Sequence, residues 1–230
     1  MAERVTNSPL GANVTKGRPD PFFIAGALGL DFLNSIATPI DEPVEWLASG
    51  EDLLQWMNRA GLITGEAAQN LHASALPGEL DAAAEQARGL REWFRGFVQR
   101  HRGEPLSTEV LVELEPLNRL LARDEAFDQI VTRDVREGGR AVSNLRLAQQ
   151  RRGRSPDALL QPIAKAVAEV LCDVSFADIR ACEGSLCSLL YVDPTRGHTR
   201  RWCSMAVCGN RSKQAAYRER SKNRRTRLPT

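Results

Sequence analysis

Residues 182–211 read CEGSLCSLLYVDPTRGHTRRWCSMAVCGNR and hold four of the five cysteines of the chain. Four residues separate Cys182 from Cys187, four separate Cys203 from Cys208, and fifteen lie between the two pairs. Two short-spaced pairs can bring four sulfurs to the corners of one tetrahedron, which is the geometry that Zn²⁺ adopts with thiolate ligands. The pattern therefore predicts one structural Zn²⁺, with no coordination position left open for catalysis.

Two other states of these cysteines are ordinary buried thiols and a pair of disulfides. The spacing alone is less diagnostic than the two-residue gap of commoner zinc pairs. Residues 1–20 contain no apolar segment of the kind found in signal peptides, so we expect a cytoplasmic protein. Disulfides are rare in the cytoplasm, and zinc is the favoured interpretation. The fifth cysteine, Cys172, is expected to be a core thiol at the apolar end of a helix.

The motifs around the cysteines resemble a known family. CGNR at 208–211, RRWCSM at 200–205 and YVDPTRG at 191–197 are similar to the CGNR zinc finger, the C-terminal module of a bacterial family of stress-induced transcription regulators. LGLDFLNS at 28–35 is similar to the LALDFVNT-like segment that opens the N-terminal module of that family, called ABATE. Ser35 and the SLLYVD run depart mildly from the family pattern and leave the cysteines intact. The resemblance implies zinc binding and DNA binding.

Charge is distributed unevenly along the chain. Residues 195–230 carry eleven Lys/Arg and one acidic residue, Glu219, which gives a net charge of +10. The rest of the chain carries 20 basic and 28 acidic residues, which gives −8. A basic end on an acidic body indicates a polyanionic partner, and we favour DNA, although phosphate contacts alone do not distinguish DNA from RNA.

The basic end is predicted to form a helix after Cys208, because it lacks proline up to residue 228 and is rich in good helix formers. Spacings of 7, 4 and 3 place Arg211, Arg218, Lys222 and Arg225 on one face, and Lys213, Arg220, Arg224 and Arg227 on a second. The predicted nucleic-acid contacts are Arg200, Arg201, Arg211, Lys213, Arg218, Arg220, Lys222, Arg224 and Arg225. Two alternatives stay open: a solvated basic tail, or neutralisation of the negative zinc–thiolate centre by Arg200, Arg201 and Arg211.

The remainder of the chain predicts a mainly α fold with a small β-hairpin (α+β), followed by a treble-clef-like zinc finger. The expected units are a flexible arm (1–20), a mainly helical ABATE-like domain (21–150), a connecting helix (151–177) and the finger with its basic helix (178–230). The clearest helix is 79–101, where apolar residues recur at spacings of three and four. Pro116 should kink or split a helix over 107–122, and Glu137–Arg140 reads as the turn of a hairpin.

Asp31 and Asn34 are two polar residues within the apolar segment 22–35. A buried polar pair must be hydrogen-bonded, so these residues are either structural anchors, which we favour, or part of a ligand pocket.

The sequence thus predicts a zinc-binding, DNA-binding regulator whose N-terminal body senses a small-molecule ligand or forms a homodimer. The alternative is a small-molecule or redox-sensing protein in which zinc is only a structural clip. We predict no enzyme, because the chain has no Gly-rich phosphate loop, catalytic triad pattern or metalloprotease histidine pair. We predict no membrane span, because no apolar run approaches the roughly 20 residues that a span needs.

Overall fold

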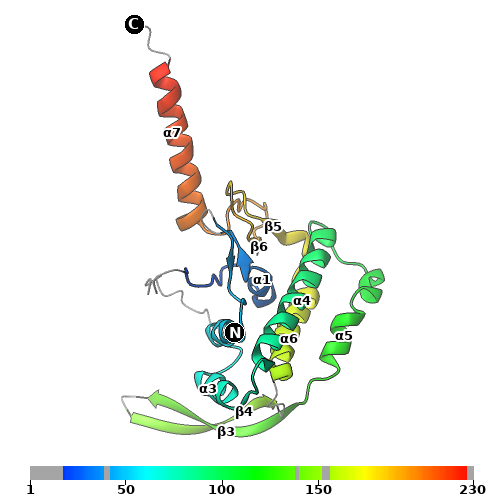
Figure 1. The fold of residues 1–230 in the computed structure, drawn as a ribbon. Coiled ribbons are helices and arrows are strands. Elements are labelled where there is room, and N and C mark those ends of the chain that lie inside the picture. Colours follow the sequence, from blue (N-terminus) through cyan, green and yellow to red (C-terminus); the bar gives the residue numbers. More distant parts are fainter. Residues whose placement is uncertain (1–17, 39–41, 138–139, 152–155, 227–230) are drawn as a thin grey trace.

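Two long helices form the centre of the body (Figure 1). The computed structural model describes residues 18–38, 42–137, 140–151 and 156–226. In it α4 (Glu79–His101) and α6 (Leu160–Asp173) pack against each other and against the short α1 (Leu28–Leu33). The apolar stripe predicted for α4 faces this core, where Phe94 and Phe97 are fully buried. The helix has the bounds that the sequence predicted.

Shorter elements surround this centre. α2 (Gly50–Arg59) and α3 (Gly65–Ser74) each begin after a residue type that favours helix starts: Ser49 accepts a hydrogen bond from the Asp52 N–H, and Thr64 accepts one from the Ala67 N–H. The helix expected over 107–122 is split into η1 (Thr108–Val112) and α5 (Glu115–Leu121). Pro116 stands in the first turn of α5, where a missing N–H removes no helical hydrogen bond.

α6 takes a more central place than the connecting helix that the sequence suggested. A 3-10 turn, η2 (Pro156–Leu159), leads into it. α1 approaches α6 so closely that a Cβ on Gly29 would lie 2.5 Å from the Ala166 carbonyl oxygen. The prediction for Cys172 was wrong, because this thiol lies on the exposed side of the last turn of α6.

The predicted hairpin is present. β3 (Ala126–Glu137) and β4 (Arg140–Arg151) pair antiparallel in a regular register from Ala126↔Arg151 to Glu137↔Arg140. The ribbon lies at the opposite end of the molecule from the C-terminal helix (Figure 1). Its Ala148 is buried, whereas the large apolar side chains Ile130, Leu145 and Leu147 are exposed. The described parts of the chain contain no helix long and apolar enough to cross a membrane.

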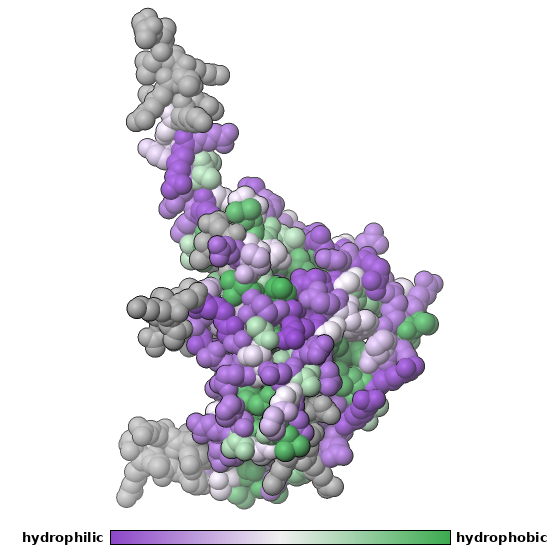
Figure 2. Space-filling view, in the orientation of Figure 1, coloured by the Kyte–Doolittle hydropathy of each residue, from purple (hydrophilic) through white to green (hydrophobic). Residues whose placement is uncertain are grey.

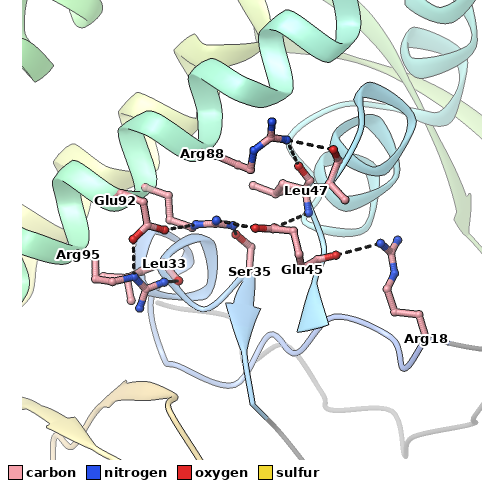
Figure 3. A network of polar contacts seen from close by, with 10 residues as sticks. Arg18, Leu33, Ser35, Glu45, Leu47, Arg88, Glu92 and Arg95 are labelled. Atoms are coloured by element: carbon pink, nitrogen blue, oxygen red, sulfur yellow. Dashed lines mark hydrogen bonds and ion pairs between the residues drawn. The ribbon is translucent and has the colours of Figure 1, made fainter. Parts of the chain in front are cut away.

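Buried charges join α4 to the chain that follows α1 (Figure 3). Arg91, only 2% exposed, makes two hydrogen bonds to the Glu45 carboxylate, of 2.8 and 2.6 Å, and one of 3.0 Å to the Ser35 hydroxyl. Arg95 donates to the Leu33 carbonyl at 2.6 Å. These bonds fix β1 (Ile36–Ala37) and β2 (Val44–Glu45), a two-residue ladder that begins just after α1.

Asp31 holds the chain that leads into α1. One oxygen of its carboxylate accepts hydrogen bonds from the Ile24 and Ala25 N–H groups, each at 2.9 Å. Burial raises the pKa of Asp31 to about 6, and the two hydrogen bonds counter only part of that effect. The carboxylate is therefore an anchor whose ionised form is less stable in the fold than in water.

Replacing Asp31 by Asn should change the pH dependence of stability. Because the pKa of Asp31 is raised in the folded state, its carboxyl contributes stability below about pH 4, and this stability is lost as pH rises through about 6. The loss is about 3 kcal/mol of the free energy of unfolding. The Asp31→Asn variant should avoid this loss, because asparagine cannot ionise and still offers an oxygen acceptor. In urea unfolding from pH 4 to 7.5, the free energy of unfolding of the variant should rise relative to that of wild type as pH rises. The control Asp173→Asn, at an exposed position, should show the same pH dependence of unfolding free energy as wild type. The same pH dependence in Asp31→Asn would refute the role given to Asp31.

Candidate metal centre and basic helix

The four clustered cysteines come from two short loops. β5 (Ile179–Ala181) and β6 (Leu190–Val192) pair antiparallel, and the loop between them carries Cys182 and Cys187. Cys203 lies two residues before the single π-turn η4 (Met205–Gly209), and Cys208 lies within it. Each loop alone is too short to bury a core, so we expect a metal ion between the four cysteines to hold the two loops together.

The sulfur atoms match a tetrahedral site. All four Sγ atoms lie within 4.8 Å of one another, with 3.8 Å between Cys187 and Cys203 and 3.7 Å between Cys203 and Cys208. A tetrahedron with Zn–S bonds of about 2.3 Å has edges of about 3.8 Å. The separations of the sulfur atoms are therefore close to those of a tetrahedral zinc site.

The surroundings favour a closed thiolate centre. The Cys182 sulfur accepts hydrogen bonds from the Gly184 N–H at 3.4 Å and the Cys203 N–H at 3.3 Å. Without a cation the four thiols cannot all ionise: the hydrogen bond with Cys182 raises the pKa of Cys187 to about 12, and burial raises the pKa of Cys208. A divalent cation at the centre offsets the repulsion between the negative thiolates and so allows all four to ionise. A Cβ at position 184 would lie 3.1 Å from the Cys208 sulfur, a tight contact that favours glycine there.

Comparison with known proteins agrees with this arrangement. Residues 26–174 match the family model ABATE, which is described as "Putative stress-induced transcription regulator", and residues 179–221 match the CGNR zinc finger. The chain belongs to the ABATE family. Neither family is of an enzymatic type, and no curated protein matches the chain. The CGNR match and the cysteine geometry together assign a structural Zn²⁺ to Cys182, Cys187, Cys203 and Cys208.

The predicted basic helix is α7 (Asn210–Thr226), which starts directly after the last cysteine turn of the CGNR finger. It projects from the body into solvent, and its visible surface is mostly hydrophilic (Figures 1 and 2). Of the predicted contacts, Arg211, Lys213, Arg218 and Arg220 lie on this helix; Lys213, Arg218 and Arg220 are exposed, and Arg211 is half-buried. The helix also spans Lys222, Arg224 and Arg225, whereas Arg227 lies outside the described residues.

Arg200 is hydrogen-bonded within the protein. Its guanidinium donates to the carbonyls of Trp202 at 3.0 Å, Val192 at 3.2 Å, Ile24 at 3.3 Å and Cys203. These bonds use its donors within the protein, and sequence analysis could not anticipate them because Ile24 is 176 residues away. Arg201 differs, because it is 60% exposed on its side chain and pairs at the surface with Glu183, at 2.6 Å.

Asn34 is buried against the finger, with its amide donating to the Leu190 carbonyl at 2.8 Å and accepting from the Leu190 N–H at 3.0 Å. These bonds, like those of Asp31, are those of a structural anchor. The sequence did not indicate two cavities, of about 630 Å³ and about 70 Å³. The larger lies at the end of α4 beside Arg100, His101 and Glu113, and neither is lined by Asp31 or Asn34.

Removing two ligands should abolish metal binding. We expect Cys203→Ser/Cys208→Ser to lose the zinc of the wild-type protein, because two hydroxyls do not replace two thiolates at a soft-ligand site. Metal content per chain, measured by atomic emission, tests this. Cys172→Ser is the matched control, since that thiol is exposed and outside the cluster, and it should keep its zinc. Zinc retained by the double variant would contradict the ligand assignment.

Proposed function

We propose that this ABATE-family protein is a zinc-binding transcription regulator whose CGNR finger presents α7 to the phosphates of duplex DNA. The observation that carries the proposal is a basic helix that projects from a metal-held finger, with Lys213, Arg218 and Arg220 exposed. Arg201 adds a further exposed cation at the base of the helix. Arg200 is excluded from the contact set because the protein itself uses its donors.

The physical argument is that α7 has cations on more than one face and little apolar surface. A lone helix of 17 residues is marginal in water, and like charges one turn apart destabilise it further. Phosphates relieve this repulsion, and each neutralised phosphate releases a counterion. The major groove of B-DNA, about 12 Å wide, admits a helix, whereas the deep, narrow major groove of duplex RNA does not. Duplex DNA is therefore the favoured partner.

Neutralising the accessible cations of α7 should weaken DNA binding in a salt-dependent way. For Lys213→Gln/Arg218→Gln/Arg220→Gln, the slope of log affinity against log salt should fall by about 2 to 3, because each phosphate contact contributes about 0.9. Fluorescence anisotropy with generic duplex DNA at several salt concentrations measures this slope.

The matched control is Arg100→Gln/Arg119→Gln/Arg123→Gln, which removes three exposed charges from the body. We expect this variant to lose far less of the slope than the α7 variant. If both triple variants behave alike, net charge and not α7 governs binding, and the proposed interface is wrong.

The finer part of the proposal is that the ABATE domain forms a homodimer through the β3–β4 ribbon. Ile130 and Leu147 are directly opposite each other in the register, Leu145 lies on the next row of the same face, and all three are at least 66% exposed. A two-stranded ribbon is marginally stable alone, and an exposed apolar face on it favours an isologous contact with the same face of a second copy.

Polar substitutions on this face should dissociate the dimer. We expect Leu145→Ser/Leu147→Ser to sediment as a monomer at concentrations where wild type is a dimer, because the substitutions remove the apolar contact. Leu111→Ser/Val112→Ser, on η1, replaces two comparably exposed apolar side chains elsewhere and should remain dimeric. A wild-type protein that stays monomeric at all concentrations in sedimentation velocity would refute the dimer.

The second candidate function is a small-molecule or redox-sensing protein in which zinc is a structural clip. Its support is the larger cavity, of about 630 Å³, whose lining is mainly polar and includes Arg100, His101 and Glu113. A ligand would bind there, at the end of α4, and not at Asp31 and Asn34. Stoichiometric zinc without salt-sensitive DNA binding would favour this candidate.

A further inference from the structure

The hydrogen bonds between the CGNR finger and the ABATE domain concentrate on one segment of the domain, residues 24–38. On the domain side this segment includes α1 and its flanks; on the finger side the partners are β6 and the loops that carry the cysteines. Two of the four cysteines, Cys203 and Cys208, are at most 3% exposed and belong to the same continuous core as α1. The metal centre is therefore built into the domain interface.

Asn34 substitutes for a neighbouring strand. Its side-chain amide makes the two hydrogen bonds to Leu190, one to the carbonyl and one from the N–H, that a paired backbone would make. The adjacent carbonyl of Leu189 accepts from the N–H of the ligand Cys182 at 3.0 Å. One peptide unit thus separates the Asn34 amide from the backbone of the first zinc ligand.

The chain before α1 is held from two sides. The Ala25 carbonyl accepts from the Val192 N–H at 2.8 Å, and the Ile24 carbonyl accepts from Arg200, which also binds the carbonyl of Cys203. On the other side, Asp31 binds the N–H groups of Ile24 and Ala25. The guanidinium of Arg200 therefore contacts both the ABATE domain and the backbone of a metal ligand.

The opposite end of the segment is tied to α4. Consecutive residues face different partners: Leu33 accepts from Arg95 (Figure 3), Asn34 pairs with Leu190, and Ser35 accepts from Arg91. A displacement of α1 would break bonds to the finger and to α4 together.

We propose that zinc binding in the CGNR finger and the ordered docking of residues 24–35 are thermodynamically coupled, so that the segment is a metal-dependent latch between the two domains. Loss of the metal releases the cysteine loops, removes the partners of Asn34, Ala25 and Ile24, and loosens the segment. By linkage, a change in the ABATE domain that loosens the segment weakens zinc binding by the same factor. The inference rests on the structural zinc and is independent of DNA binding.

Hydrogen–deuterium exchange on the full-length wild-type protein tests the coupling. Removal of zinc with a chelator should speed amide exchange about tenfold or more in residues 24–35 as well as in residues 179–209, because local opening sets the exchange rate. Residues 83–98 in the middle of α4 should exchange as before and serve as the internal reference. Unchanged protection of residues 24–35 in the metal-free protein would overturn the proposal.

The reciprocal arm measures zinc affinity by competition with a chromophoric chelator. Asn34→Ala should weaken zinc binding roughly tenfold, because it removes two hydrogen bonds to Leu190. Asn34→Asp, which keeps only the acceptor, should lie between this variant and wild type. Asn58→Ala, the same substitution at an exposed position of α2, should leave the affinity unchanged. Wild-type affinity in Asn34→Ala would refute the coupling; if that variant fails to fold, the exchange experiment on wild type still decides.

Discussion

Four cysteine sulfur atoms cluster within 4.8 Å of one another, and the C-terminal part of the molecule depends on this cluster. β5 and β6 have three residues each, and a ladder of that length has no stability of its own. Metal binding substitutes for the core that such a small module cannot build, since the free energy of binding is folding free energy. The four-cysteine centre consequently sets the position of everything attached to it, including the first turn of α7.

The centre and α7 are also linked electrostatically. Four thiolates and one Zn²⁺ carry a net charge of about −2. The turn of Cys208 leads directly into α7, so the positive end of the helix dipole lies beside this negative charge. Arg200, held over the Tyr191 ring at 4.2 Å, adds a fixed positive charge near Cys203. Arg218 and Arg220, farther along α7, are exposed to solvent instead, where an external anion can reach them.

Local signals in the sequence were sufficient for much of the fold. The cysteine spacing located the metal site because its ligands lie in two short loops, and Ser49 and Thr64 marked helix starts because an N-cap bond spans three residues. Long-range contacts were not readable: the guanidinium of Arg200 reaches Ile24, and nothing near either residue announces the other. The hairpin was readable because its signal is local: the turn at Glu137–Arg140 marks where β3 ends and β4 begins, and the two strands pair directly across it.

Asn34 shows how the two modules explain each other. Within the sequence, a carboxylate and an amide three residues apart in an apolar helix were compatible with an anchor and with a ligand site. Asp31 and Asn34 lie on the same side of α1 because a spacing of three brings side chains onto one face, and the structure places that side against β6 and the chain that precedes α1. The amide satisfies both backbone groups of Leu190, which would otherwise be buried without partners at a cost of about 1–3 kcal/mol each. The polar residues of the ABATE opening segment therefore serve to receive the finger, and the N-terminal motif has its physical explanation at the other end of the chain.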